Sequence, residues 1–124
     1  MATLEMNLQN FESTVENNDI VLIDFWASWC GPCRMFGPIF EEASEKHPDM
    51  VFAKVDTQAQ QQLAAQFGIR SIPTLAIFRE QIPIFMQPGA LPAKSLEDLI
   101  GKVAELDMDE VRAAYEKAKA EGAA

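Results

Sequence analysis

The sequence is short of the side chains that bind metals, because its 124 residues include only two cysteines and one histidine. A closed structural zinc site takes four ligands, usually Cys or His. Three candidate ligands cannot complete such a site within one chain, so the sequence predicts no metal. The single histidine, His47, precedes Pro48 at an expected helix end, and we expect it to lie on the surface rather than to act in catalysis.

Long apolar runs and an excess of basic residues are also missing. No run of about 18 apolar residues occurs, so we expect no membrane-spanning helix. The net charge of −9 argues against a nucleic-acid surface and against an anionic membrane face. Residues 1–9 lack the basic and apolar stretches of a signal peptide, so the expected compartment is cytoplasmic. With 48% apolar residues, the chain can bury the core of one compact domain.

Both cysteines lie in one short motif, Trp29-Cys30-Gly31-Pro32-Cys33. Two intervening residues allow a small disulfide ring across one helical turn, but not a crosslink between distant segments. The motif therefore favours thiol–disulfide chemistry over a structural role, with a buried and inert pair as the alternative. In a reducing cytosol, such a pair would be used for exchange rather than locked as a permanent disulfide.

Apolar periodicity predicts strands that alternate with helices, which is typical of an α/β fold. Residues 20–27 are almost wholly apolar, as in a central strand buried on both faces. Crossover connections make the early strand pairs parallel, whereas the short connection after Arg79 requires an antiparallel hairpin, so the sheet is mixed. Pro38 predicts a kink within its helix, and Pro83 predicts an edge strand. The expected strands are 3–7, 20–27, 50–55, 74–79 and 82–86; the expected helices lie around Phe11 and Val15, from the cysteines to Pro48, and at 59–67, 95–106 and 107–120.

Several motifs occur in one order along the chain: Asp24-Phe25-Trp26-Ala27, the cysteine motif, Lys54, Ile72-Pro73-Thr74 and Gly89-Ala90. With these motifs the sequence resembles the thioredoxin family over about residues 3–106. The resemblance implies a thioredoxin fold, in which helices flank a central mixed sheet of about five strands. We therefore expect a thioredoxin domain at 1–106 and a C-terminal helical extension at 107–124.

The resemblance also implies an activity, which is the reduction of disulfides in protein substrates. An NADPH-dependent thioredoxin reductase would return the electrons, and the only redox group would be the Cys30–Cys33 disulfide, with no bound cofactor. In the family, a Gly-Pro pair between the cysteines accompanies reductants, whereas a His in the second slot accompanies oxidants and isomerases. Two alternatives stay open: a redox-independent binding or chaperone-like module, and a disulfide oxidase or isomerase.

The expected chemistry begins at Cys30, which would lie at the N-terminus of a helix. Free backbone N–H groups and the helix dipole there favour a thiolate and lower the pKa of Cys30 from about 8.5 toward neutrality. We expect Cys30 to be the more exposed cysteine and the attacking one, while Cys33 resolves the mixed disulfide. Pro32 suits the first helical turn, and Gly31 lets a substrate backbone approach closely.

Asp24 is the one acid in the expected central strand. Burial would raise its pKa and make it a proton acceptor for Cys33, directly or through water. Lys54, on the neighbouring strand, would offset the carboxylate charge. The alternatives for Asp24 are a structural ion pair and a solvated position at the sheet edge.

The resemblance further implies a cis peptide bond between Ile72 and Pro73, which presents the Ile72 backbone to an extended substrate. Strand addition of this kind gains its affinity from main-chain hydrogen bonds. The alternative for Trp29 is partial packing in the core. The residues expected to form a shallow apolar substrate surface are Trp29, Gly31, Ile72, Pro73, Gly89 and Ala90.

The sequence departs from the family pattern at Ser71, at 79–83 and at Pro88. Ser71 replaces a Gly or another small residue, and the hairpin turn at 79–83 has no glycine. These departures bear on the range of partners rather than on the chemistry. Beyond the family's usual end, an apolar stripe is formed by Met108, Val111, Tyr115 and Ala118, for which docking on the domain, self-association and fraying all stay open.

Overall fold

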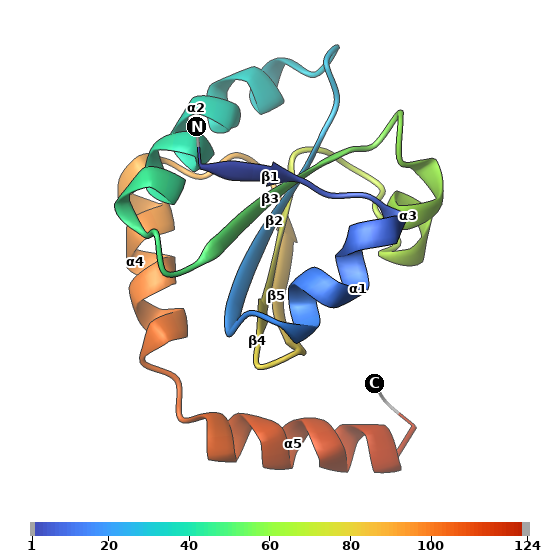
Figure 1. The fold of residues 1–124 in the computed structure, drawn as a ribbon, viewed down its shortest axis with the longest axis vertical. Helices are drawn as coiled ribbons and strands as arrows, with labels where there is room; N and C mark the ends of the chain where they lie inside the picture. Colours follow the sequence, from blue (N-terminus) through green and yellow to red (C-terminus); the bar gives the residue numbers. More distant parts are fainter. Residues whose placement is uncertain (1, 123–124) are drawn as a thin grey trace.

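The computed structural model describes residues 2–122, which form a central sheet with helices on both faces (Figure 1). The expected elements are all found, with boundaries shifted by a few residues. The strands are β1 (Thr3–Glu5), β2 (Ile20–Trp26), β3 (Val51–Asp56), β4 (Thr74–Arg79) and β5 (Ile82–Pro88). The helices are α1 (Leu8–Glu16), α2 (Gly31–Lys46), α3 (Gln61–Gln66), α4 (Ala93–Ala104) and α5 (Met108–Ala120).

The sheet is mixed, as the sequence predicts, and its strand order is β1-β3-β2-β4-β5. Strand β3 runs parallel to β1 and β2, whereas β4 runs antiparallel to β2 and β5. The strand β2 therefore lies at the centre, and Asp24 on it faces Lys54 of β3 and Leu75 of β4 across the ladder. Because β2 is covered on both faces, its side chains are apolar with the exception of Asp24.

Two apolar clusters cover the two faces of the sheet. Successive side chains of a strand point to opposite faces, so Leu22 joins one cluster and Ile23 the other. The first cluster packs α2 and α4 on the sheet and includes Phe36, Phe40, Phe52, Ile77, Leu96 and Ile100. The second packs α1 and α3 on the other face and includes Val15, Phe25, Val55, Leu63 and Ala76.

Proline and glycine lie at several informative positions in these elements. Pro83 lies on β5, which is an edge strand of the sheet, so that prediction is confirmed. Gly68 has φ +66° and directly follows the end of α3, a conformation that glycine adopts without steric cost. Helix α2 continues through Pro38, and the predicted kink at that residue stays a prediction.

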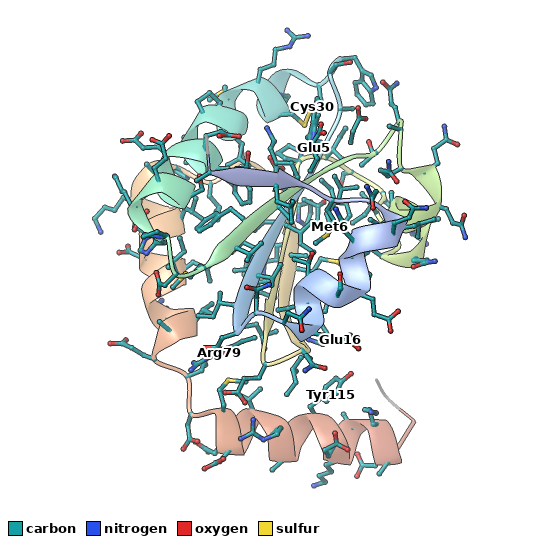
Figure 2. The ribbon with its side chains drawn as sticks, in the orientation of Figure 1. Glu5, Met6, Glu16, Cys30, Arg79 and Tyr115 are labelled. Atoms are coloured by element: carbon teal, nitrogen blue, oxygen red, sulfur yellow. A yellow bond between two sulfur atoms is a disulfide. The ribbon has the colours of Figure 1, made fainter. Side chains whose placement is uncertain are left out.

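The segment after α4 is helical and lies against the hairpin end of the domain. Asp107 caps α5 by accepting hydrogen bonds from the N–H groups of Asp109 and Glu110. Arg112 pairs with Glu80 of the β4–β5 turn, and Met108 is buried. Val111, Tyr115 and Ala118 are half-buried, and Figure 2 shows Tyr115 rising from α5 toward the domain.

Arg79, at the end of β4, joins this region to helix α4. Its Nη1 donates to the carbonyl oxygens of Val103 at 2.7 Å and of Ala104 and Leu106 at 3.2 Å. A guanidinium at this position satisfies carbonyl groups that the end of a helix leaves without partners. Within residues 2–122, no helix is long and apolar enough to cross a membrane.

Candidate active site

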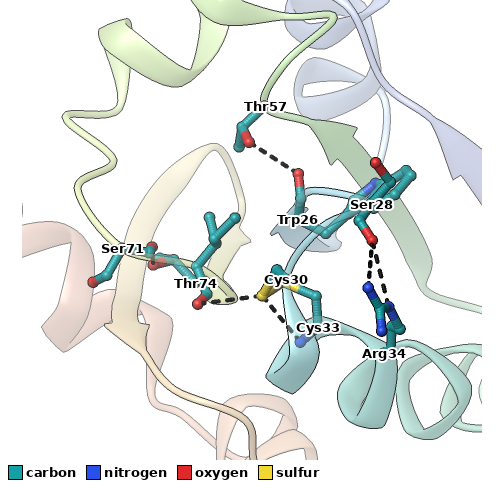
Figure 3. Close-up of a disulfide and its surroundings, with 9 residues drawn as sticks. Trp26, Ser28, Cys30, Cys33, Arg34, Thr57, Ser71 and Thr74 are labelled. Carbon is teal, nitrogen blue, oxygen red and sulfur yellow. Dashed lines mark hydrogen bonds between the residues drawn. A yellow bond between two sulfur atoms is a disulfide. The ribbon is translucent and has the colours of Figure 1, made fainter.

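The two cysteines lie where the end of the central strand meets the start of a helix. Cys30 is the N-cap residue of α2, and its N–H donates to Ala27 O at 3.3 Å. Cys30 and Cys33 form a disulfide with their Cα atoms 5.3 Å apart. The N–H of Cys33 donates to Cys30 Sγ at 3.2 Å (Figure 3). The free N–H groups of the first helical turn thus lie beside one particular sulfur, that of Cys30.

Exposure does not distinguish the two cysteines, so the expectation that Cys30 is the more exposed is wrong. Cys30 is 4% exposed and Cys33 5% exposed. Trp26 and Ile72 pack against the pair, and the Ile72 carbonyl oxygen lies 3.7 Å from Cys30 Sγ. The Ile72 loop therefore covers Cys30 in this oxidised state. The feature that separates the cysteines is the position of Cys30 at the helix N-terminus.

Asp24 is buried without a hydrogen-bond partner. It is 1% exposed, and neither carboxyl oxygen has a partner among residues 2–122. Burial raises the pKa of Asp24 from 3.8 to about 7, while the positive charge of Lys54 acts in the opposite direction. The expected rise of the pKa is confirmed, and the alternative of a solvated edge position is wrong.

Lys54 lies next to Asp24 on the neighbouring strand, as the sequence predicts. No salt bridge between these two side chains occurs within the described part of the chain. The Nζ atom of Lys54 instead lies 5.2 Å from the ring centroid of Trp26, a favourable cation–π distance. The ammonium group therefore offsets the Asp24 charge from a distance rather than through an ion pair.

Cys33 and Lys54 both line a groove of about 640 Å³ beside α2. We call it the α2 groove. Arg34 also lies on its wall and donates from Nε and Nη2 to Ser28 O at 3.4 and 3.3 Å. Cys33 lines this groove, whereas Cys30 does not. The lining residues are Trp26, Ala27, Ser28, Cys33, Arg34, Gly37, Pro38, Glu41, Glu42, Glu45 and Lys54.

The Ile72–Pro73 peptide bond is cis, which confirms that expectation. The N–H of Ile72 has no hydrogen-bond partner within residues 2–122. Gly89 donates its N–H to Pro73 O at 2.8 Å, so the Gly89 loop lies against the cis bond. Trp29 is 63% exposed, and the alternative that it packs partly in the core is wrong.

A second groove, of about 320 Å³, runs between Trp29 and Ile72. We call it the loop groove, because the segment between α3 and β4 forms much of its wall. Gly31, Gly89 and Ala90 are exposed and Pro73 is buried, but Gly31, Pro73, Gly89 and Ala90 are not part of this lining. The lining residues are Trp29, Thr57, Gln61, Ala64, Ala65, Ile69, Arg70, Ser71 and Ile72.

Two threonine hydroxyls, to which the sequence assigned no role, hold the loops around the disulfide. Thr57 donates its hydroxyl to Trp26 O at 3.0 Å, and Thr74 donates to Ser71 O at 2.6 Å (Figure 3). Both contacts join segments whose meeting depends on the fold, so only the position of Thr74 after Pro73 could have suggested one of them. No group of three or more potential metal ligands converges within residues 2–122.

The comparisons with known proteins agree with this geometry. The thioredoxin family model matches residues 2–102. A putative thioredoxin 2 of Streptomyces coelicolor is 58% identical over 120 residues, which cover 97% of this chain and 90% of that protein. That alignment must include most of residues 107–124, so this relative shares the C-terminal segment. Thioredoxin C-3 of Corynebacterium nephridii is 44% identical over 95 residues, or 76% of this chain and 66% of that protein.

Solved structures show the same fold. A mutant thioredoxin from Halobacterium salinarum has a TM-score of 0.78 at 35% identity, covering 84% of this chain and 92% of the other. A Malassezia sympodialis thioredoxin has a TM-score of 0.72 at 36% identity, with coverages of 82% and 91%. The likeness extends over most of this chain and nearly all of the other two.

Proposed function

This chain belongs to the thioredoxin family, and we propose that Cys30 is the attacking and Cys33 the resolving sulfur of its reaction. The protein is a thiol–disulfide oxidoreductase that reduces disulfides in other proteins. The observation that carries the assignment of roles is the N-cap position of Cys30, whose Sγ lies 3.2 Å from the Cys33 nitrogen. A helix N-terminus stabilises an anion, and the thiolate is the reactive form of cysteine.

The reaction proceeds by two exchanges of sulfur partners. The Cys30 thiolate attacks one sulfur of the substrate disulfide, and the other substrate sulfur leaves as a thiolate. Cys33 then loses its proton and attacks Cys30 Sγ, which releases the second substrate sulfur. The substrate gains two electrons and, with solvent protons, ends as two thiols, while the protein ends with the Cys30–Cys33 disulfide.

Asp24 accepts the proton of Cys33 in this scheme. A carboxyl group with a pKa of about 7 can gain and lose a proton near neutral pH, which suits a general base. Lys54 keeps the resulting charges in balance from the neighbouring strand. The α2 groove, which Cys33 and Lys54 both line, offers the proton a path to solvent.

The substrate segment pairs with the Ile72 backbone. Support comes from the free N–H of Ile72 and from its carbonyl oxygen, which lies 3.7 Å from Cys30 Sγ. Trp29, 63% exposed, lines the same groove as Ile72 and provides apolar contact. Gly31 leaves the approach to Cys30 open, and no atom lies within 4 Å of the position that a Cβ would take there. Pro32 begins α2 without needing a hydrogen bond at its nitrogen, and Pro73, Gly89 and Ala90 complete the substrate surface.

The electron donor is an NADPH-dependent thioredoxin reductase, and the compartment is the cytoplasm. The donor is proposed from the family, because a dithiol that reduces many substrates needs a dedicated source of electrons. A reducing compartment also keeps the Cys30–Cys33 pair available for exchange rather than locked as a disulfide.

The activity is tested by the reduction of insulin with dithiothreitol, followed as turbidity. We expect the protein to accelerate the reaction and the Cys30→Ser variant to lose the acceleration, because the attacking sulfur is gone. An equal rate with both proteins would instead favour a redox-independent binding module.

An equilibrium with glutathione separates a reductant from an oxidase or isomerase. A reductant has a low potential, so its pair becomes mostly oxidised in a glutathione mixture, whereas the pair of an oxidase stays reduced. Finding the Cys30–Cys33 pair mostly reduced would contradict the proposed role.

A further inference from the structure

The loop groove contains one charged side chain, Arg70, among its nine lining residues. Arg70 is exposed, and no hydrogen bond or ion pair engages its guanidinium within the described part of the chain. Arg34, on the other side of the disulfide, is different, because its guanidinium is occupied by the Ser28 carbonyl. Of these two arginines near the reactive sulfurs, Arg70 is the one available to bind another molecule.

The backbone around Arg70 is fixed on both sides. The N–H of Ile69 donates to Ala64 O at 3.1 Å, at the end of α3. The carbonyl of Ser71 accepts the hydroxyl of the buried Thr74 at 2.6 Å. These two hydrogen bonds anchor the segment that carries Arg70 and Ser71 at the rim of the groove.

The rim lies directly beside the reacting sulfur. Ile72 follows Ser71 and lines the same groove, and its carbonyl oxygen is 3.7 Å from Cys30 Sγ. Figure 3 shows Ser71 and Thr74 on one side of Cys30, opposite Ser28 and Arg34. An extended chain advances about 3.3 Å per residue. A substrate residue within about three positions of the attacked cysteine therefore comes within reach of a long arginine side chain.

We propose that Arg70, assisted by the hydroxyl of Ser71, determines specificity by binding a carboxylate near the disulfide of the substrate. The proposal rests on the substrate pairing described under the proposed function. A guanidinium recognises a carboxylate with two parallel hydrogen bonds, and the serine hydroxyl adds a third donor. Because the net charge of the protein is −9, acidic segments are repelled by the molecule as a whole. Arg70 would thus select substrates with a carboxylate at one position near the disulfide, rather than acidic proteins in general.

Synthetic peptides that each contain one internal disulfide test this proposal. They are identical except for Glu, Gln or Lys at a position two residues from a cysteine, and kcat/KM for their reduction is measured. We expect the wild-type protein to prefer the Glu peptide over the Gln peptide by about threefold to tenfold at low ionic strength. Added salt should reduce this ratio, because the pair is exposed.

Substitutions of Arg70 then change the ratio in a defined order. Arg70→Gln should bring the ratio of Glu to Gln peptide close to one, and Arg70→Glu should favour the Lys peptide. Arg70→Lys should retain part of the preference, because it keeps the charge but loses the paired hydrogen bonds. The salt dependence of the wild-type ratio gives a readout that does not depend on any variant folding.

Arg34→Gln is the matched control, because it removes the same charge on the opposite side of the disulfide. We expect it to keep the preference for the Glu peptide. A wild-type ratio of one overturns the proposal, as does an equal loss of preference in Arg34→Gln and Arg70→Gln, which would reveal only a general charge effect. If the wild-type protein reduces none of the peptides, the proposed function itself fails. If it reduces all of them equally, only the role of Arg70 fails.

Discussion

Asp24 has a carboxyl group buried at the centre of the sheet with no hydrogen-bond partner among residues 2–122. Burial of this kind disfavours the charged form and destabilises the folded state once the group ionises. The unfolded chain loses this proton near pH 3.8, whereas the folded protein keeps it until about pH 7. The proton therefore stabilises the fold fully below about pH 4, and this contribution is lost as the pH rises to about 7.

The variant Asp24→Asn should remove this dependence on pH. Relative to wild type, its free energy of unfolding should rise by about 1.4 kcal/mol per pH unit from pH 4 to 7, or about 3–5 kcal/mol in total. Above pH 8 the difference should be constant. Urea unfolding of the oxidised proteins across this range measures it.

Asp49→Asn serves as the control, because Asp49 is an exposed acid. The free energy of unfolding of Asp49→Asn, relative to wild type, should change little with pH. If the free energy of unfolding changed with pH in the same way for Asp24→Asn and wild type, the burial of an ionisable carboxyl group at this position would be contradicted.

The sequence predicted the functional residues that local patterns reveal. One acid in an apolar strand indicated the raised pKa of Asp24, and the spacing of the cysteines indicated their disulfide. The exposure of Cys30 could not be predicted, because it depends on Ile72, which lies 42 residues further along the chain. The groove at Arg70 was missed for the same reason, since its walls come from separate segments that only the fold brings together.

The β4–β5 hairpin has a turn in which two residues other than glycine adopt left-handed backbone conformations. Glu80 has φ +51° and Gln81 has φ +70°. Two-residue hairpin turns require positive φ and usually place Asn or Gly there. Here the turn is held from outside, because the N–H of Glu80 donates to Asp19 O at 2.8 Å and its carboxylate pairs with Arg112 of α5.

Gln81→Gly should therefore stabilise the protein. Glycine adopts positive φ without the steric cost of a Cβ, so we expect the free energy of unfolding to rise by about 1 kcal/mol. The melting temperature should rise by a few degrees in a thermal scan.

Gln62→Gly, in the exposed part of α3, is the matched control. It should lower stability by about 1 kcal/mol, because glycine is unfavourable within a helix. A loss of stability in Gln81→Gly similar to that of the control would mean that the turn is not strained.

The helices and strands followed from periodicity, but their mutual contacts did not. The stripe on α5 suggested docking, self-association or fraying with no means of choosing among them. The choice comes from Arg112 and Glu80, whose pairing depends on where the hairpin turn lies. Arg79 was likewise read only as the end of a strand, although it binds three carbonyl oxygens at the end of α4.

The molecule places its reactive cysteines and its C-terminal helix at opposite ends (Figures 1 and 2). The thioredoxin family model ends at residue 102, before α5 begins. The contacts of α5 with the domain centre on the buried Met108 and on the Arg112–Glu80 pair. This arrangement supports the division into a thioredoxin domain at 1–106 and a helical extension at 107–124, which stays a prediction.

Truncation after Leu106 tests that division. We expect residues 1–106 to fold and to reduce insulin at a rate close to that of the full chain, because α5 is remote from the site. Stability should fall by about 1.5–3 kcal/mol, the contribution of one buried methionine side chain. Loss of insulin reduction in a truncated protein that still unfolds cooperatively would show that α5 contributes to the activity.

In the molecule as a whole, Cys30 is the more reactive of the two sulfurs because it lies at the helix N-terminus. The most direct measurement is alkylation of the fully reduced protein at pH 7 with limiting iodoacetamide, followed by mass-spectrometric location of the modified residue. We expect Cys30 to be modified first and Cys33 only later. Preferential modification of Cys33, or no modification of either residue in the folded protein, would contradict it.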